Sequence, residues 1–202
     1  MGERIQGQRI YLKPLTFEDA LLLRGWGSHD SDLFIDYNLA DMSNTELHFW
    51  YLSKKKGRKK SYFAIYTYEN QFVGYLGLKD MNLFKKTAFL GIVLDPNEMN
   101  QGFGTEAIHL LMDYFFNSLK MKKMRLDVNL FNTRAIHTYE KIGFITLGEY
   151  LAEFENQDVD FEDPKYKEDF KYFQYFKGKL YTRVYVMEID VWRYEMRRGN
   201  AI

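Results

Sequence analysis

The chain has 202 residues, of which 46% are hydrophobic and 18% aromatic, so it is long and apolar enough for one domain with a substantial core. Its 28 basic and 28 acidic side chains balance, and this neutrality gives no reason to expect nucleic-acid or membrane binding. The absence of cysteine excludes disulfides, thiolate metal ligands and a cysteine-acyl intermediate.

The overall composition also sets expectations about location and partners. No long apolar run and no signal-peptide pattern occurs, so we expect a cytoplasmic protein that is a monomer or a homodimer. The four histidines lack the spacing of metal ligands, and we therefore expect no metal site.

Residues 54–60 form a basic run with six lysines or arginines in seven positions. The simplest interpretation is a solvated turn, and the functional alternatives are a nucleic-acid contact or a site near bound phosphates.

A predicted strand and a glycine pair dominate the middle of the chain. The strand spans residues 87–94 and is closed by Asp95-Pro96, which cannot continue a central strand. Gly102 and Gly104 then open a helix. Glycines at a helix start let the backbone approach a phosphate, and the free N–H groups and helix dipole favour an anion there.

The periodicity supports the helix and the elements after it. Apolar residues recur every three or four positions on one face of the helix, at Ala107, Ile108, Leu111, Met112, Phe115 and Leu119. Met124–Val128 predicts a short strand, Asn132 a helix N-cap, and Gly143 the residue that ends the second helix. On that second helix, Tyr139 shares one face with Ala135 and Ile136.

The glycine motif also satisfies the dinucleotide fingerprint. Gly102 to Ala107 reads G-x-G-x-x-A, and Asp127 follows roughly 20 residues later. That fingerprint requires the strand to run almost directly into the first glycine. Here Asp95 to Gln101 intervene, so we reject this interpretation.

Residues 149–169 carry nine acidic side chains against Lys165 and Lys167. This acidic segment is either a solvated loop or a surface that attracts a cationic amine.

The joint pattern of Gly102-Phe103-Gly104-Thr105-Glu106-Ala107, Asn132 and Tyr139-Glu140-Lys141-Ile142-Gly143-Phe144 resembles the GNAT acyltransferase superfamily. The resemblance is closest to the branch that acetylates protein N-termini, ribosomal proteins and small amines. It extends to Arg9–Ala20, similar to that branch's first strand and a helix capped at Thr16, and to Phe173–Ile189, similar to its closing strand pair. Because the branch normally passes quickly into that pair, the resemblance implies that residues 149–169 are an acidic insertion.

The resemblance implies a fold and an activity. The fold is an α/β (α+β) domain over residues 1–202, with a mixed, splayed sheet of about six or seven strands flanked by about four helices. The cofactor would lie in the splay between strands 87–94 and 124–128. The activity is the direct transfer of an acetyl group from acetyl-coenzyme A to a primary amine.

The same resemblance implies roles for individual residues. Tyr139 would donate a proton to the departing thiolate. The coenzyme would be bound by Ile92, Val93, Leu94, Gln101, Gly102, Phe103, Gly104, Thr105 and Asn132. Met99 stands where the superfamily usually has Gln or Arg, so backbone donors are expected to hold the pyrophosphate. Residues 28–60 would cover the substrate side and contribute Phe34, Tyr37, Phe49 and Trp50 to core and pocket wall.

The identity of the general base stays open, because strand 87–94 carries no aspartate or glutamate that could take the proton from the incoming amine. Asp127, the acids after residue 149 and a water relay are alternatives. Two other functions are compatible with the sequence: a non-catalytic coenzyme A-binding regulatory module, and an RNA- or ribosome-associated protein that uses the basic run.

Overall fold

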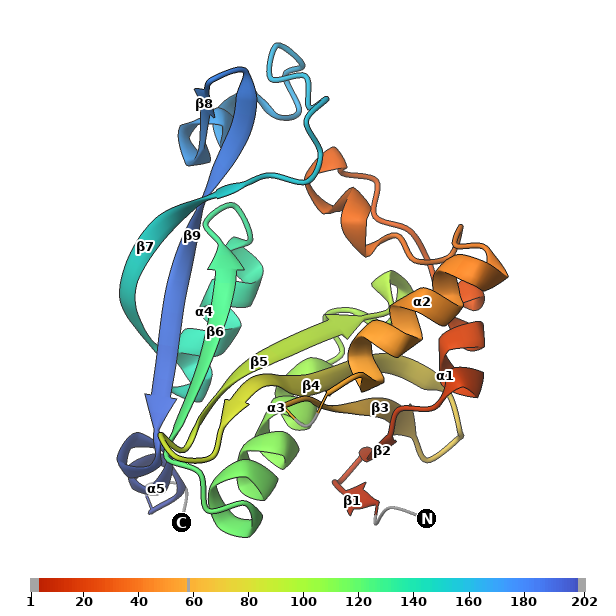
Figure 1. Cartoon of the computed structure of the whole chain (residues 1–202), viewed down its shortest axis with the longest axis vertical. Helices are drawn as coiled ribbons and strands as arrows, with labels where there is room; N and C mark the ends of the chain where they lie inside the picture. Colours follow the sequence, from red (N-terminus) through yellow and green to blue (C-terminus); the bar gives the residue numbers. More distant parts are fainter. Residues whose placement is uncertain (1–3, 58, 200–202) are drawn as a thin grey trace. The chain divides into compact units, whose positions relative to one another are not determined.

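A computed structural model describes residues 4–57 and 59–199, so Arg58 of the basic run lies outside the described residues. The chain forms two compact units (Figure 1). The N-terminal unit runs to His29 and from Tyr37 to Met124, and the C-terminal unit contains Asp30–Asp36 and the chain from Arg125 onward. None of the described helices is long and apolar enough to cross a membrane.

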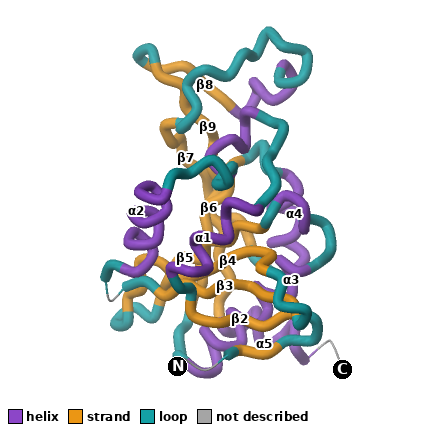
Figure 2. Tube along the Cα trace, turned by 90° about the vertical axis from the view of Figure 1, so that its right-hand side faces the viewer, coloured by secondary structure: helices purple, strands orange, loops and turns teal. Residues whose placement is uncertain are grey.

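The N-terminal unit is an antiparallel sheet in which each strand pairs with the next one in the chain. Figure 2 shows β2, β3 and β4 running side by side. Its strands are β1 (Ile5–Gln6), β2 (Ile10–Pro14), β3 (Ser61–Thr67), β4 (Phe72–Asn82) and β5 (Thr87–Leu94). Its helices are α1 (Phe17–Leu22), α2 (Asn44–Lys55) and α3 (Phe103–Asp113).

The helices of this unit cover opposite faces of the sheet, because successive strand residues point to opposite sides. Tyr75 on β4 belongs to the apolar cluster that also holds Leu23 and Leu47, next to and on the helices α1 and α2. Gly74, the preceding residue, packs against Leu94, whose side chain in turn faces α3. Helices α1 and α2 are therefore separated from α3 by the sheet.

Helix α1 begins with the predicted cap. The Thr16 hydroxyl accepts from the Asp19 backbone, and the Asp19 carboxylate accepts from the Thr16 backbone, which forms a capping box. Asp19 is also buried, and it is satisfied by Lys13 at 2.7 Å and by the Tyr66 hydroxyl at 2.7 Å. This carboxylate raises the pKa of Tyr66, after the larger effect of burial.

Helix α3 ends earlier than its apolar periodicity predicts. The α-helix stops at Asp113, and a π-helical turn, η4 (Tyr114–Ser118), follows. The wider turn brings two consecutive residues, Phe115 and Phe116, into the core, whereas Leu119 is 37% exposed.

The C-terminal unit contains the long strand β9, which pairs antiparallel with both β7 and β8. Its elements are β6 (Lys123–Asn129), α4 (Thr133–Ile142), β7 (Ile145–Glu153), β8 (Phe173–Phe176), β9 (Lys179–Asp190) and α5 (Val191–Gly199). The predicted closing strand pair is confirmed as a β8–β9 hairpin. Lys177 and Gly178 form its two-residue turn with φ of 49° and 76°, as a type I′ turn requires.

The acidic segment is not a wholly solvated loop. Glu149 and Glu153 lie on β7, so the predicted insertion begins inside a strand. Three apolar side chains that follow are buried in a separate cluster with Leu33, Phe131, Phe173 and Leu180; they are Phe154, Val159 and Tyr166. Because these buried side chains hold the segment in place, the acidic residues of the segment have defined positions.

The described residues contain nine strands and five α-helices in a mixed α/β arrangement. The resemblance implies about six or seven strands and about four helices, and the two-residue strand β1 lies outside the elements that the sequence predicts.

Candidate active site

The loop after β5 is positioned by a buried aspartate. Asp95 ends the strand and accepts hydrogen bonds from the backbone N–H of Asn97 at 3.0 Å and of Gly27 at 2.9 Å. A short 3-10 turn, η3 (Pro96–Glu98), leads from there toward Gly102. The predicted strand end at Asp95-Pro96 is thus confirmed.

Gly102 is the N-cap of α3 and has a φ of +84°, a conformation that side chains other than glycine's rarely adopt. Glycine has no side chain to cap the helix, and no other side chain in the described ranges does so. The first N–H groups of an α-helix have no intrahelical acceptor, so those of Phe103, Gly104 and Thr105 are available to an anion. The predicted pyrophosphate-binding loop therefore has the backbone geometry that it needs.

The helix start packs closely on β5. A Cβ at Gly104 would lie 2.9 Å from Leu94 Cδ1 and 3.8 Å from Ile92 Cδ1. The structure thus brings three of the predicted cofactor-binding residues together in the N-terminal unit. It also shows that the missing Cβ of Gly104 points toward Leu94, which adds a packing reason for this glycine.

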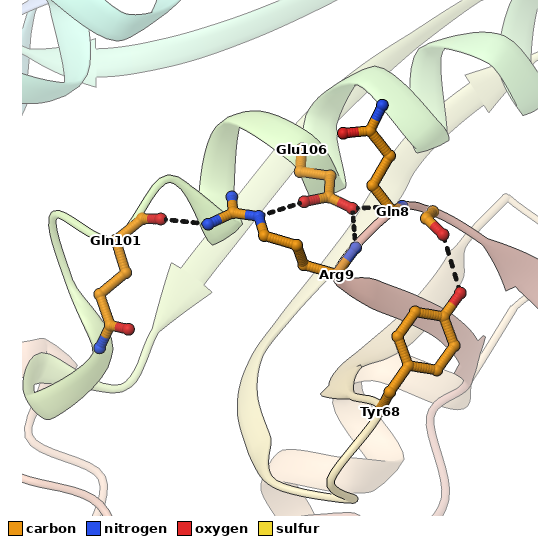
Figure 3. A network of polar contacts seen from close by, with 6 residues as sticks. Gln8, Arg9, Tyr68, Gln101 and Glu106 are labelled. Carbon is orange, nitrogen blue, oxygen red and sulfur yellow. Dashed lines mark hydrogen bonds and ion pairs between the residues drawn. The ribbon is translucent and has the colours of Figure 1, made fainter.

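Arg9 brings a cation to the same loop (Figure 3). Its Nη1 donates to the Gln101 carbonyl at 2.8 Å, and its Nε donates to Glu106 Oε2 at 3.1 Å. Glu106 Oε1 accepts from the backbone N–H groups of Gln8 and Arg9 at 2.8 and 2.9 Å. The guanidinium lies 5.1 Å from the centre of the Phe103 ring.

Sequence analysis missed this contact. Arg9 and Glu106 are 97 positions apart, and no spacing pattern links two residues that meet only in the folded sheet. Arg9 supplies a positive charge beside the loop. Within the loop, the uncharged Met99 occupies the position at which the motif usually has Gln or Arg.

We expect Arg9→Ala to weaken acetyl-coenzyme A binding by roughly fivefold to tenfold, because about 1 kcal/mol of charge and loop positioning is lost. The loss should be equal for coenzyme A and dephospho-coenzyme A, which share the pyrophosphate. Titration calorimetry measures both, with Arg4→Ala as the matched control, since Arg4 lies over Tyr11 rather than at the loop. Unchanged affinity in Arg9→Ala would limit Arg9 to a packing role.

The remaining predicted site residues belong to the C-terminal unit. Asn132 is the N-cap of α4, and its side chain accepts from the Ala135 N–H at 3.3 Å. Tyr139 lies on the same helix, half-buried, with its ring 5.8 Å from that of Phe144. Gly143 ends the helix with a φ of +122°, as predicted.

The candidate bases have different surroundings. Strand β5 carries no acid, and Asp127 lies exposed on β6, where it accepts a hydrogen bond from Tyr150. Burial, followed by the charge of Asp127, raises the pKa of Tyr150. Among the residues placed by the structure, no group of three or more His, Cys, Asp or Glu could hold a metal ion.

The four aromatic residues that the resemblance assigns to the substrate side lie in different surroundings. Phe49 is 66% exposed, whereas Trp50 packs on the N-terminal core with its ring 5.0 Å from that of Tyr75. Phe34 packs in the C-terminal cluster, 5.4 Å from the ring of Phe131. Tyr37 is 37% exposed.

Comparison with known proteins identifies a family. The family model described as an acetyltransferase (GNAT) domain matches residues 9–145. Spermidine N(1)-acetyltransferase of Escherichia coli (strain K12) is 28% identical over 155 residues, which cover 72% of this chain and 77% of the relative. A probable N-acetyltransferase, YjcK, of Bacillus subtilis (strain 168) is 28% identical over 153 residues, or 69% and 82% of the two chains.

Solved structures show the same fold. The crystal structure of spermidine N-acetyltransferase from Vibrio cholerae in complex with CoA and spermine matches with a TM-score of 0.70 and 21% identity. The match covers 94% of this chain and 99% of that one.

Proposed function

Because the chain belongs to the acetyltransferase (GNAT) domain family and is an acyltransferase that uses acetyl-coenzyme A, we propose that its acceptor is a polyamine or a similar cationic amine. The observation that carries the proposed acceptor is the similarity of this chain to proteins named spermidine N(1)-acetyltransferase. The uncapped start of α3, with Gly102 and Arg9, supports the binding of the coenzyme. We further propose that residues 1–202 act as one acetyltransferase domain in the cytoplasm. Support for the single domain comes from the family match, which includes residues of both units.

In the proposed reaction, the neutral acceptor amine attacks the thioester carbonyl, and the tetrahedral intermediate then releases coenzyme A as a thiol. The N–H groups at the start of α3 would hold the pyrophosphate, with Arg9 beside them. Backbone groups of Ile92 and Val93 would bind the pantetheine arm and stabilise the developing oxyanion. Asn132 would contact the coenzyme, and Tyr139 would donate the proton that the thiolate needs.

Carboxylates in the C-terminal unit support a cationic acceptor. Burial, and then the negative charge of Glu155, raise the pKa of Asp36, so the charges of these two acids act on one another. Other acids are partly neutralised. Glu149 pairs with Arg183 at 2.5 Å and Glu153 with Lys179 at 2.7 Å, all on exposed strand positions. The unpaired part of the acidic segment is thus smaller than its nine acids suggest.

The proposal is tested by a thiol-release assay with acetyl-coenzyme A and a panel of spermidine, spermine, amino sugars, amino acids and N-terminal peptides. We expect the highest kcat/KM with a polyamine. Preference for an uncharged or peptide acceptor would overturn the proposed substrate class. Coenzyme A binding without turnover on any amine would instead favour a non-catalytic module.

Neutralising the acidic segment should weaken polyamine use. We expect the amide replacements Glu153→Gln, Glu155→Gln, Asp158→Asn and Asp160→Asn together to lower kcat/KM for spermidine several-fold at low salt. The difference should shrink above about 0.1 M salt, where the Debye length is about 10 Å. A monoamine acceptor serves as the control, because its single charge feels the field less. An unchanged kcat/KM for spermidine at low salt would leave the segment without a role in recognition.

A further inference from the structure

Three aromatic rings of the N-terminal unit surround one ammonium group. Lys54 Nζ lies 5.3 Å from the centre of the Trp50 ring, 5.3 Å from that of Tyr62 and 5.7 Å from that of Tyr75. Trp50 precedes Lys54 by one turn of α2, whereas Tyr62 and Tyr75 come from the neighbouring strands β3 and β4. We call these three rings the aromatic cage.

Lys54 differs from the other lysines of the basic run. Lys55 and Lys56 are exposed, but Lys54 is partly buried. Burial lowers the pKa of Lys54, and the positive charges of Lys60 and Lys79 lower it further. Within residues 4–57 and 59–199, no carboxylate lies at ion-pair distance from its Nζ. The rings are therefore the main favourable partners of this ammonium, and each such contact contributes about 0.5 to 2 kcal/mol.

The cage lies on the face of the sheet that α1 and α2 cover. Tyr75 is the cross-strand partner of Val93 on β5, and such partners share one face of the sheet. Val93 and Trp50 pack against the same apolar cluster that contains Tyr75. Backbone groups of Ile92 and Val93 are expected to bind the pantetheine arm and the acetyl carbonyl, so the cage lies next to the strand at which the proposed reaction takes place.

We infer that the aromatic cage is a binding subsite for an ammonium group of the acceptor, and that Lys54 fills it as an internal competitor until the acceptor displaces it. This inference rests on the proposed function only in that the acceptor is cationic. The basic run, whose other described lysines are exposed, thereby gains one residue with a part in recognition.

The energetics allow this exchange. Aromatic faces attract ammonium ions of ligands by the same ring quadrupole that attracts a lysine. Because no carboxylate of the described residues holds Lys54, its displacement costs the contacts with the rings, and the ammonium of the acceptor restores these contacts. When a ligand must displace an occupant, its apparent affinity is its intrinsic affinity multiplied by the fraction of time for which the subsite is empty. Lys54 therefore lowers the apparent affinity for the acceptor without lowering the intrinsic affinity of the rings.

The test measures spermidine binding by titration calorimetry without acetyl-coenzyme A. Lys54→Ala empties the cage and retains a good helix former, and we expect it to lower the Kd of spermidine by about fivefold or more. The matched control is Lys55→Ala, which removes the same charge one residue away. Its Kd should stay within about twofold of the wild type. Lys54→Arg keeps a cation near the rings and should behave as the wild type does.

A second substitution locates the effect. In the double variant Lys54→Ala/Tyr62→Leu one cage ring is lost, and the gain in spermidine affinity should disappear while the melting temperature shows that the protein is folded. Equal Kd changes in Lys54→Ala and Lys55→Ala, or no spermidine binding in Lys54→Ala, would overturn the inference. Tighter binding by Lys54→Ala without any thiol release from acetyl-coenzyme A would sustain the subsite but refute the proposed acceptor. Thiol release with spermidine, together with an unchanged Kd of spermidine in Lys54→Ala, would support the proposed acceptor but refute the subsite.

Discussion

Tyr139→Phe is expected to lower kcat on the order of 100-fold, because it removes the hydroxyl that would protonate the departing thiolate. The ring packs 5.8 Å from that of Phe144, and phenylalanine retains this contact. Protein stability and the Kd of acetyl-coenzyme A should therefore be unchanged. Single-turnover kinetics with excess enzyme measure the chemical step separately from product release.

The matched control for this substitution is Tyr175→Phe, which makes the same chemical change at a tyrosine on β8 that is 53% exposed. It should leave kcat unaltered. A loss of less than about threefold in Tyr139→Phe, in the single-turnover regime, would assign Tyr139 to packing and leave the proton donor unidentified.

Gly104→Val is expected to abolish measurable binding of acetyl-coenzyme A. A branched side chain at this position would crowd the phosphate site and would also press against Leu94, whose Cδ1 would lie 2.9 Å from the new Cβ. Either effect moves the N–H groups at the start of α3 out of position, and these groups are the proposed pyrophosphate ligands. Equilibrium dialysis with labelled coenzyme measures the loss, and wild-type affinity in Gly104→Val would show that the pyrophosphate lies elsewhere.

A double variant separates the two causes. In Gly104→Val/Leu94→Ala the contact with residue 94 is relieved, whereas any crowding of the phosphate remains. Recovery of binding would attribute the loss to packing between α3 and β5. Continued loss would attribute it to the phosphate site itself.

Local signals in the sequence predicted the elements that carry the site. The strand Thr87–Leu94, the caps at Thr16 and Asn132 and the helix end at Gly143 were predicted from the sequence and are confirmed. The two caps and the helix end depend on interactions within a few residues, such as the hydrogen bond that the Ala135 N–H donates to the Asn132 side chain. The end of α3 was placed too late, because the π-helical turn is favoured by the burial of Phe115 and Phe116 and not by local periodicity.

The sequence by itself indicated the family, because the glycine pair, Asn132 and Tyr139 follow one another at a joint spacing that turn chemistry alone does not require, and the family match confirms it. Only the tertiary structure decided that Arg9 reaches the loop at Gln101, that Gly104 faces Leu94, and that Lys54 lies among Trp50, Tyr62 and Tyr75. Several of these contacts join residues far apart in the chain that the pairing of strands in one sheet brings together. Strand register and packing, which have no local signature, therefore fix the charges and rings around the site.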